Sequence, residues 1–132
     1  MHTRVYTNAL ELVPVYPGRV TAPSDRKELP LDFAYAGEAR HFVAWRGAVA
    51  GLGGGRLNDL AVAAEAVLTD VLLSAEGGIL EVESERDEEV FRIVISHPEL
   101  EGRRMSDLPA ILEQFLDGYE LSRTRAVLVQ RL

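Results

Sequence analysis

The side chains best placed for chemistry in this sequence lie on one alanine-rich, apolar stretch. Glu65 carries a carboxylate, Thr69 carries a hydroxyl four residues later, and Asp70 adds a second carboxylate. Residues four apart are neighbours on a helix, so Glu65 and Thr69 share a face if this stretch is helical. A positioned carboxylate can take a proton from an attacking hydroxyl or water, and oxygen ligands suit Mg²⁺. This group is therefore the first candidate site.

A glycine cluster and the histidines are weaker candidates. The glycine-rich residues 51–55 continue into Arg56, whereas a phosphate loop ends in Gly-Lys-Ser/Thr and a dinucleotide fingerprint follows a strand. The cluster therefore predicts a connection between two helices. His97 and Glu99 flank Pro98, which restricts the backbone, and no third metal ligand is indicated. We predict no metal site, and no serine lies in a nucleophile-elbow pattern.

The composition narrows the classes of function. The chain has 132 residues, of which 47% are hydrophobic and 27% charged, a profile typical of one globular domain. It has no cysteine, which excludes disulfides, thiolate zinc sites and cysteine nucleophiles. The formal net charge of -7 argues against nucleic acid and favours either solubility alone or a basic protein partner. With no targeting signal and no apolar run near ~18 residues, we expect a cytoplasmic protein without membrane contact.

The sequence predicts two parts that together form one compact unit. Residues 1–28 hold an edge strand at residues 10–15 and a polar connecting loop, and residues 29–132 hold the main domain. In the main domain a strand over residues 29–33 leads into a helix over residues 37–50. The expected buried face of this helix contains Phe42, Val43, Val49 and Ala50, and Trp45 sits at its margin.

A second helix over residues 57–75 is the clearest predicted element. Its apolar residues recur every three or four positions, which is typical of one buried stripe. They are Leu57, Leu60, Ala61, Ala64, Leu68, Val71, Leu72 and Ala75. Strands at residues 79–85 and 90–95 follow as a hairpin. Glu81, Glu83 and Glu85 alternate with apolar residues and are expected on a solvated sheet face, opposite Arg92.

The last part of the chain completes the predicted fold. A third helix is expected with Ser106 as its N-cap, Pro109 in its first turn and Gly118 at its exit. Strands at residues 119–121 and 125–130 follow. This order predicts an α/β (α+β) fold, a two-layer sandwich in which three helices cover one face of a mixed, mostly antiparallel sheet.

The helix at residues 60–75 resembles the N-box helix of the GHKL ATPases, the superfamily of gyrase, MutL and histidine kinases. It is most similar to the bacterial anti-sigma-factor serine kinases, whose pattern is apolar-Ala-apolar-x-Glu-Ala-apolar-x-Asn-x3-His-Ala. Glu65 falls on the family glutamate that activates the attacking group. Thr69 falls on the magnesium-binding asparagine, and Leu73 falls on the usual histidine.

The nucleotide boxes that follow in the family are replaced in this chain. In place of the adenine-binding Asp-x-Gly-x-Gly box stand residues 97–101, and in place of the Gly-x-Gly-Leu box stand residues 105–108. The ATP lid shrinks to a few residues around Gly102. The resemblance thus implies a vestigial nucleotide cleft made of Glu65, Thr69, Asp70, His97 and Gly102. Losing the adenine and magnesium contacts lowers the expected nucleotide affinity by roughly 10² to 10⁴.

The resemblance implies a non-catalytic regulatory domain, a pseudo-ATPase that acts in transcription control by binding a protein. The implied partner is a sigma factor or a STAS-type antagonist, the implied assembly is a homodimer, and no cofactor is expected. In the family the first helix builds most of the partner surface. Here that surface would carry Glu38, Arg40, Trp45 and Arg46.

Two alternatives stay open. An active ATP-dependent serine-protein kinase with divergent boxes would use Glu65 as the base and Thr69 or Asp70 to hold Mg²⁺. An unrelated small α/β module for dimerisation or ligand binding would show the same order of elements.

Overall fold

The computed structural model describes residues 25–98, 100 and 107–132. Its strands are β1 (Arg26–Pro30), β2 (Ile79–Arg86), β3 (Val90–Ser96), β4 (Gly118–Leu121) and β5 (Arg125–Arg131). They form one five-stranded sheet in the order β1-β2-β3-β5-β4, and every pairing is antiparallel. The predicted α+β fold is confirmed, although the sheet is wholly antiparallel rather than mixed.

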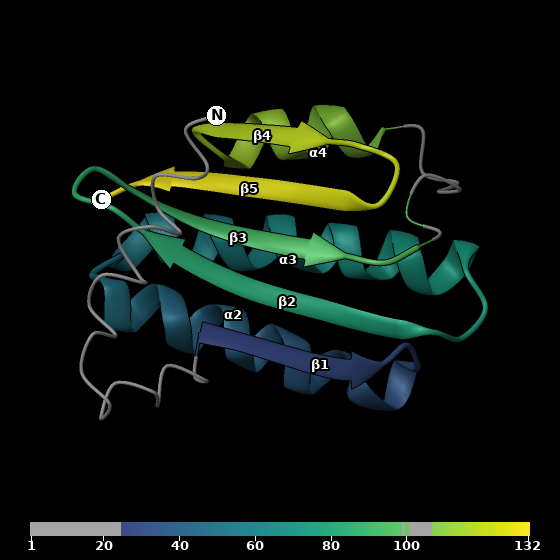
Figure 1. Ribbon diagram of the computed structural model, residues 1–132. Helices are drawn as coiled ribbons and strands as arrows, with labels where there is room; N and C mark the ends of the chain where they lie inside the picture. The colour runs from purple at the N-terminus through teal and green to yellow at the C-terminus, as the bar shows by residue number, and fades with distance from the viewer. Residues whose placement is uncertain (1–24, 99, 101–106) are drawn as a thin grey trace, which may run out of the picture.

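The helices form a second layer behind the sheet (Figure 1). They are α2 (Ala36–Ala50), α3 (Gly54–Ser74) and α4 (Leu108–Phe115), and a short 3-10 turn, η3 (Phe33–Tyr35), precedes α2. The α2 helix lies behind β1 and β2, α3 crosses behind the middle of the sheet, and α4 lies behind β4 and β5. Helices on one sheet face were predicted, and this arrangement is confirmed. In the described part of the chain, no helix combines the length and apolarity needed to cross a membrane.

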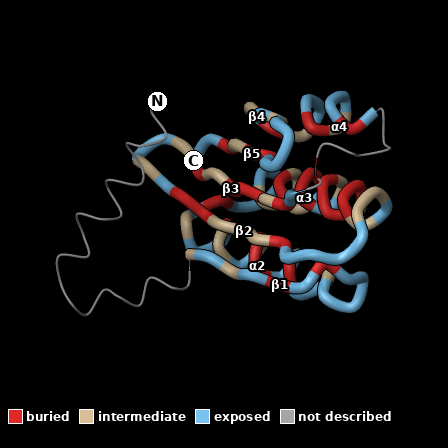
Figure 2. Tube along the Cα trace, turned by 45° about the vertical axis from the view of Figure 1, so that its right-hand side comes forward, coloured by how far each residue is buried: buried red, intermediate tan, exposed pale blue. Residues whose placement is uncertain are grey.

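The hydrophobic core lies between the two layers, where Figure 2 shows the buried residues. Alternate residues of the central strands point inward, as the two-residue period of a strand requires. On the sheet these are Leu80, Val82, Phe91, Ile93, Ile95, Ala126 and Leu128. Several side chains of α3 pack against these sheet residues: Leu60, Ala64, Val67 and Val71. The predicted stripe of the second helix is therefore confirmed in its centre, and Ala63 and Val67 extend it.

The first described strand differs from the prediction. β1 begins at Arg26, inside the segment expected to be a loop, so the predicted boundary between residues 28 and 29 falls within a strand. Pairing explains the difference, because β1 sets Arg26 opposite the oppositely charged Glu83 and Leu29 opposite Leu80. Arg26 also forms an ion pair with Glu81. The strand predicted at residues 10–15 lies outside the described residues.

The helix ends differ in smaller ways. Gly51 ends α2 in the left-handed conformation (φ 108°), as the glycine cluster suggested, but α3 already begins at Gly54, so the connection is shorter than residues 51–55. The N-cap of α4 is Asp107, and the predicted cap Ser106 lies outside the described residues. Pro109 falls in the first turn, as predicted.

Candidate functional site

The predicted catalytic carboxylate lies in water on the surface of α3. The Glu65 side chain is 55% exposed, and its Oε2 lies 3.8 Å from Nη1 of Arg40 on α2. Thr69 follows one turn later and is half-buried, so the two residues share a helix face as predicted. A general base normally lies in a cleft next to the group that it deprotonates, whereas Glu65 is exposed to water and faces a cation.

Asp70 and His97, the other described members of the predicted cleft, are buried. Asp70 is 1% exposed and lies on the core side of α3. His97 is 3% exposed just after β3, and its ring N–H donates to the carbonyl of Gly77 over 2.8 Å. Gly78 has a φ of 89°, and a Cβ there would lie 2.9 Å from His97 Nε2, so only glycine fits this close approach. Through these two contacts His97 holds Gly77 and Gly78, in the loop between α3 and β2, against the end of β3.

The structure thus brings Glu65 and Thr69 together and separates them from Asp70, which faces the core. Gly102 lies outside the described residues. Among the residues that the structure describes, no group of three His, Asp or Glu side chains could hold a metal ion.

The predicted partner surface is largely an exposed face of α2. Trp45 is 45% exposed, and its ring meets that of Phe42 edge-on, with centroids 6.4 Å apart. Together with Lys27, Glu38 and His41 these rings line a hollow of about 330 Å³ between α2 and β1. Aromatic side chains exposed next to a hollow are typical of protein contact surfaces.

Ion pairs border this face on both sides. Lys27 Nζ lies 2.9 Å from Glu38 Oε2 on the side of β1, and Arg40 faces Glu65 on the side of α3. The face is therefore apolar at its centre and charged at its margins.

Arg46, the fourth predicted partner residue, points inward instead. Its Nη2 donates to Asp25 Oδ1 over 2.8 Å, and its Nε donates to the buried Ser84 hydroxyl over 3.1 Å. Its guanidinium also lies 5.3 Å from the centre of the Trp45 ring. Arg46 therefore connects α2 to Asp25 and to Ser84 of β2, and it also packs against the Trp45 ring.

Two residues of this face were not assigned to it from the sequence. Val49 was expected in the core, but it is 59% exposed, because Ala39, Phe42 and Val43 form the buried face and Val49 follows Trp45 by one turn. His41 is exposed one turn before Trp45. The spacing of residues 41, 45 and 49 is that of one helix stripe and could have revealed both.

No protein-family model and no curated protein matches this sequence. The resemblance to the anti-sigma-factor kinases therefore stays a prediction, and function is argued from the residues of the site.

Proposed function

We propose that this chain is a non-catalytic regulatory domain that binds a protein partner on the exposed face of α2. The observation that carries this proposal is Trp45, an aromatic ring that is 45% exposed yet held by Phe42 and Arg46. Tryptophan is the residue type most enriched among the side chains that dominate binding energy at protein interfaces. A ring already fixed in place loses little conformational entropy when a partner covers it.

The rest of the face fits the same role. Trp45 and Val49 supply apolar area, and the adjacent hollow of about 330 Å³ has room for an apolar side chain of the partner. The pairs Lys27–Glu38 and Arg40–Glu65 supply a polar rim. An apolar centre with a charged rim is the usual anatomy of a specific interface.

The hydrated position of Glu65 favours binding over catalysis. Because Arg40 faces it, the Glu65 carboxylate is a rim group of the α2 face. We therefore retain the degenerate anti-sigma-factor kinase as the closest description: a cytoplasmic homodimer whose partner is a sigma factor or a STAS-type antagonist. The net charge of -7 favours a partner with a basic surface.

A retention experiment tests the proposed surface. The wild-type chain and a Trp45→Ala variant are immobilised and exposed to extract from the source cells, and retained proteins are compared. A matched control is Val62→Ala, which removes an exposed apolar side chain from α3. We expect a protein that wild type and Val62→Ala retain and that Trp45→Ala loses. Equal retention by all three chains, or none by wild type, contradicts the proposal.

A titration with Mg-ATP tests the kinase alternative. If a site with a Kd of ~10 μM existed, 1 mM ligand would add about 2.7 kcal/mol and raise the melting temperature by roughly 6–12 °C. We expect no magnesium-dependent shift. A shift that Glu65→Ala or Thr69→Ala removes would establish a working nucleotide site and overturn the non-catalytic role.

A further inference from the structure

One edge of β1 carries backbone groups that no described strand pairs. β1 ends the sheet, and within the described residues only β2 pairs with it. Where this ladder continues, the Leu31 N–H donates to the carbonyl of Gly78 over 3.0 Å. Backbone bonds to one neighbour alternate along an antiparallel strand, so Lys27 also bonds β2, whereas Arg26 and Glu28 direct their N–H and C=O groups away from it. These groups form the open edge of β1, which can pair with a further strand.

The hollow beside Trp45 lies along this edge. Its lining joins Lys27 of β1 to Phe42 and Trp45 of α2, and its volume is about 330 Å³. Successive side chains of a strand point to opposite faces, and the buried Leu29 shows that the odd-numbered residues of β1 face the helices. A strand paired with the open edge would therefore direct its residue opposite Lys27 toward the two aromatic rings.

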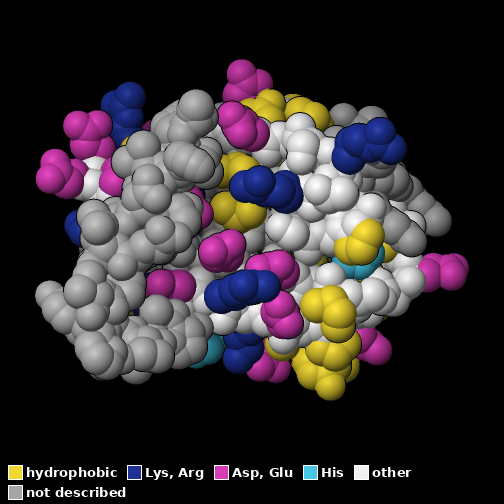
Figure 3. All heavy atoms as spheres, viewed as in Figure 1, with side chains coloured by type: hydrophobic (Ala, Val, Ile, Leu, Met, Phe, Trp, Pro, Cys, Tyr) yellow, Lys and Arg dark blue, Asp and Glu magenta, His cyan; other side chains and the backbone are white. Residues whose placement is uncertain are grey.

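The even-numbered residues of β1 point to the outer face of the sheet, which is acidic here. Arg26 forms ion pairs with Glu28 and Glu81, and it lies opposite a third glutamate, Glu83. Figure 3 shows acidic side chains gathered around a basic one on this part of the face. Burial raises the pKa of Glu83, and the like charge of Glu81 raises it further, although Arg26 and Arg125 lower it. Next to the open edge, one arginine is thus shared by three glutamates.

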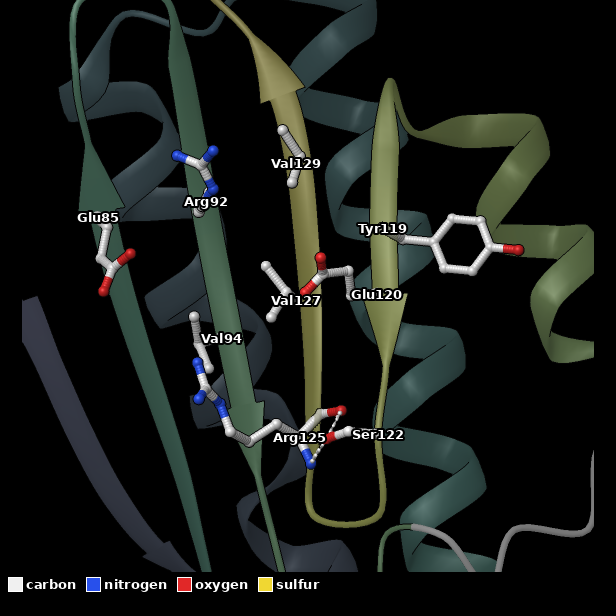
Figure 4. Close-up of a pocket in the computed structure, with 9 residues that line it drawn as sticks. All are labelled: Glu85, Arg92, Val94, Tyr119, Glu120, Ser122, Arg125, Val127 and Val129. Atoms are coloured by element: carbon white, nitrogen blue, oxygen red, sulfur yellow. Dashed lines mark hydrogen bonds between the residues drawn. The ribbon is translucent and has the colours of Figure 1, made fainter. Parts of the chain in front are cut away.

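Farther along the outer face the charges are balanced. A hollow of about 390 Å³ lies over β2, β3, β5 and β4 (Figure 4), and two residues of each sign line it: Glu85, Arg92, Glu120 and Arg125. Glu85 is only 8% exposed there, contrary to the solvated position predicted for it. This hollow therefore favours neither sign of charge in a ligand, whereas the surroundings of the open edge favour a cation.

We propose that the partner binds by strand addition: an extended segment of it pairs antiparallel with the open edge of β1. Its residue opposite Lys27 is apolar and enters the hollow beside Trp45. Its residue opposite Glu28 is a lysine or arginine, whose charge faces the glutamates of the outer face. Backbone bonds to Arg26 and Glu28 supply affinity, and the two side chains supply specificity. This inference rests on the proposed function and names how the partner binds there.

The chain's own predicted N-terminal strand does not match this pattern. Residues 10–15 hold no lysine or arginine, and their one charged side chain is the acidic Glu11. They also contain Pro14, which lacks the N–H that a ladder needs. A basic segment of another protein complements the open edge better.

The test is an NMR titration of the full-length chain with short capped peptides. The probe is acetyl-Thr-Val-Lys-Leu-Thr-amide, which places its lysine opposite Glu28 and its leucine opposite Lys27. For a peptide this small we expect saturable shifts with a Kd on the order of 1 mM. The shifts should appear at the backbone amides of Arg26 and Glu28 and at the indole N–H of Trp45. The amide of Val62 on α3 should stay unchanged.

Two matched peptides separate the backbone contribution from the charge contribution. A methyl group on the backbone nitrogen of the peptide's lysine removes the donor to the Glu28 carbonyl, and it should weaken binding at least about tenfold. Replacing that lysine with glutamate brings a like charge to the edge, and it should weaken binding roughly fivefold. Equal binding of the methylated peptide and the probe overturns strand addition.

Variants of the chain complete the test. Glu28→Lys should reverse the preference, so that the glutamate peptide binds more tightly than the lysine peptide. Glu88→Lys, which changes an exposed glutamate of the β2–β3 turn, should keep the wild-type order. An unchanged preference in Glu28→Lys overturns the proposal. So does the absence of any saturable shift at β1, which is the result expected if residues 10–15 or a second copy of the chain already pair with the edge.

The strand addition and the proposed function can fail separately. If Trp45→Ala loses the retained protein while the lysine peptide shifts no amide of β1, the α2 surface stands and strand addition is wrong. Retention of the protein by Trp45→Ala instead contradicts the proposed surface itself.

Discussion

Replacing Arg46 with alanine tests whether this residue stabilises the fold. If it does, the free energy of unfolding falls in the isolated chain, with no partner present. The change removes one hydrogen bond to the Asp25 carboxylate and one to the Ser84 hydroxyl. The Arg46 and Asp25 side chains are only 18% and 21% exposed, so water replaces little of what is lost. A hydrogen bond to a charged group contributes about 1.5–3 kcal/mol and a neutral one about 1 kcal/mol. Partial rehydration of Asp25 leaves an expected loss of about 2–3 kcal/mol.

The assay is thermal and urea unfolding followed by circular dichroism. For a domain of this size the loss corresponds to a fall in melting temperature of roughly 6–12 °C. The matched control is Arg40→Ala, which breaks an exposed pair at 3.8 Å and should cost less than about 0.5 kcal/mol. The structural role of Arg46 would be refuted if Arg46→Ala melted within about 2 °C of wild type, or no lower than Arg40→Ala.

Further predictions concern the core and the outer sheet face. Gln130 is 2% exposed and bonds the backbone of Arg56, Phe115 and Asp117, so Gln130→Leu should cost about 2–4 kcal/mol in urea unfolding. Gly37→Ala, with its nearest contact at 3.7 Å, should stabilise α2 by up to about 1 kcal/mol, because alanine favours a helix. Gly47→Ala should be less stable than Gly37→Ala by about 1 kcal/mol, because its Cβ would lie 2.8 Å from Leu57 Cδ1 and 3.4 Å from Leu60 Cδ2, and these methyl groups would have to move. A small or absent difference between these two glycine variants would contradict the close packing of α2 on α3. The raised pKa of Glu85 means that its ionised form costs stability above that pKa, and that the cost fades as pH falls toward 4.5. Glu85→Gln should therefore melt higher than wild type near pH 7 and equal to it near about pH 4, and a lower melting point at neutral pH would argue against an uncompensated charge.

Patterns with a strong period predicted most of the fold. The apolar stripe of α3 and the alternation in β2 each follow one buried face, so both elements are confirmed almost to their ends. A strand was predicted at residues 29–33, but β1 spans Arg26–Pro30, because the Arg, Lys and Glu that open this edge strand have the composition of a loop. These three residues become part of the sheet through their pairing with Glu83, Val82 and Glu81 of β2.

The site was less predictable, because it depends on where side chains point. The resemblance implied a surface that includes Glu38, Arg40 and Trp45, and all three side chains are exposed. The inward position of Arg46 could not be predicted from the sequence, because its hydrogen-bond partners Asp25 and Ser84 lie far from it along the chain. Likewise, the alternation in β2 indicates which way Glu85 points but not that its neighbours bury it.

The measurement that tests the central claim most directly is the affinity of the retained partner for wild type and for Trp45→Ala, by isothermal titration calorimetry. If the partner covers the α2 face, loss of the ring should weaken binding by about 2 kcal/mol or more, which is a roughly thirtyfold rise in Kd. Val62→Ala should leave the Kd unchanged. Equal Kd values for wild type and Trp45→Ala, with both chains folded, would contradict the account.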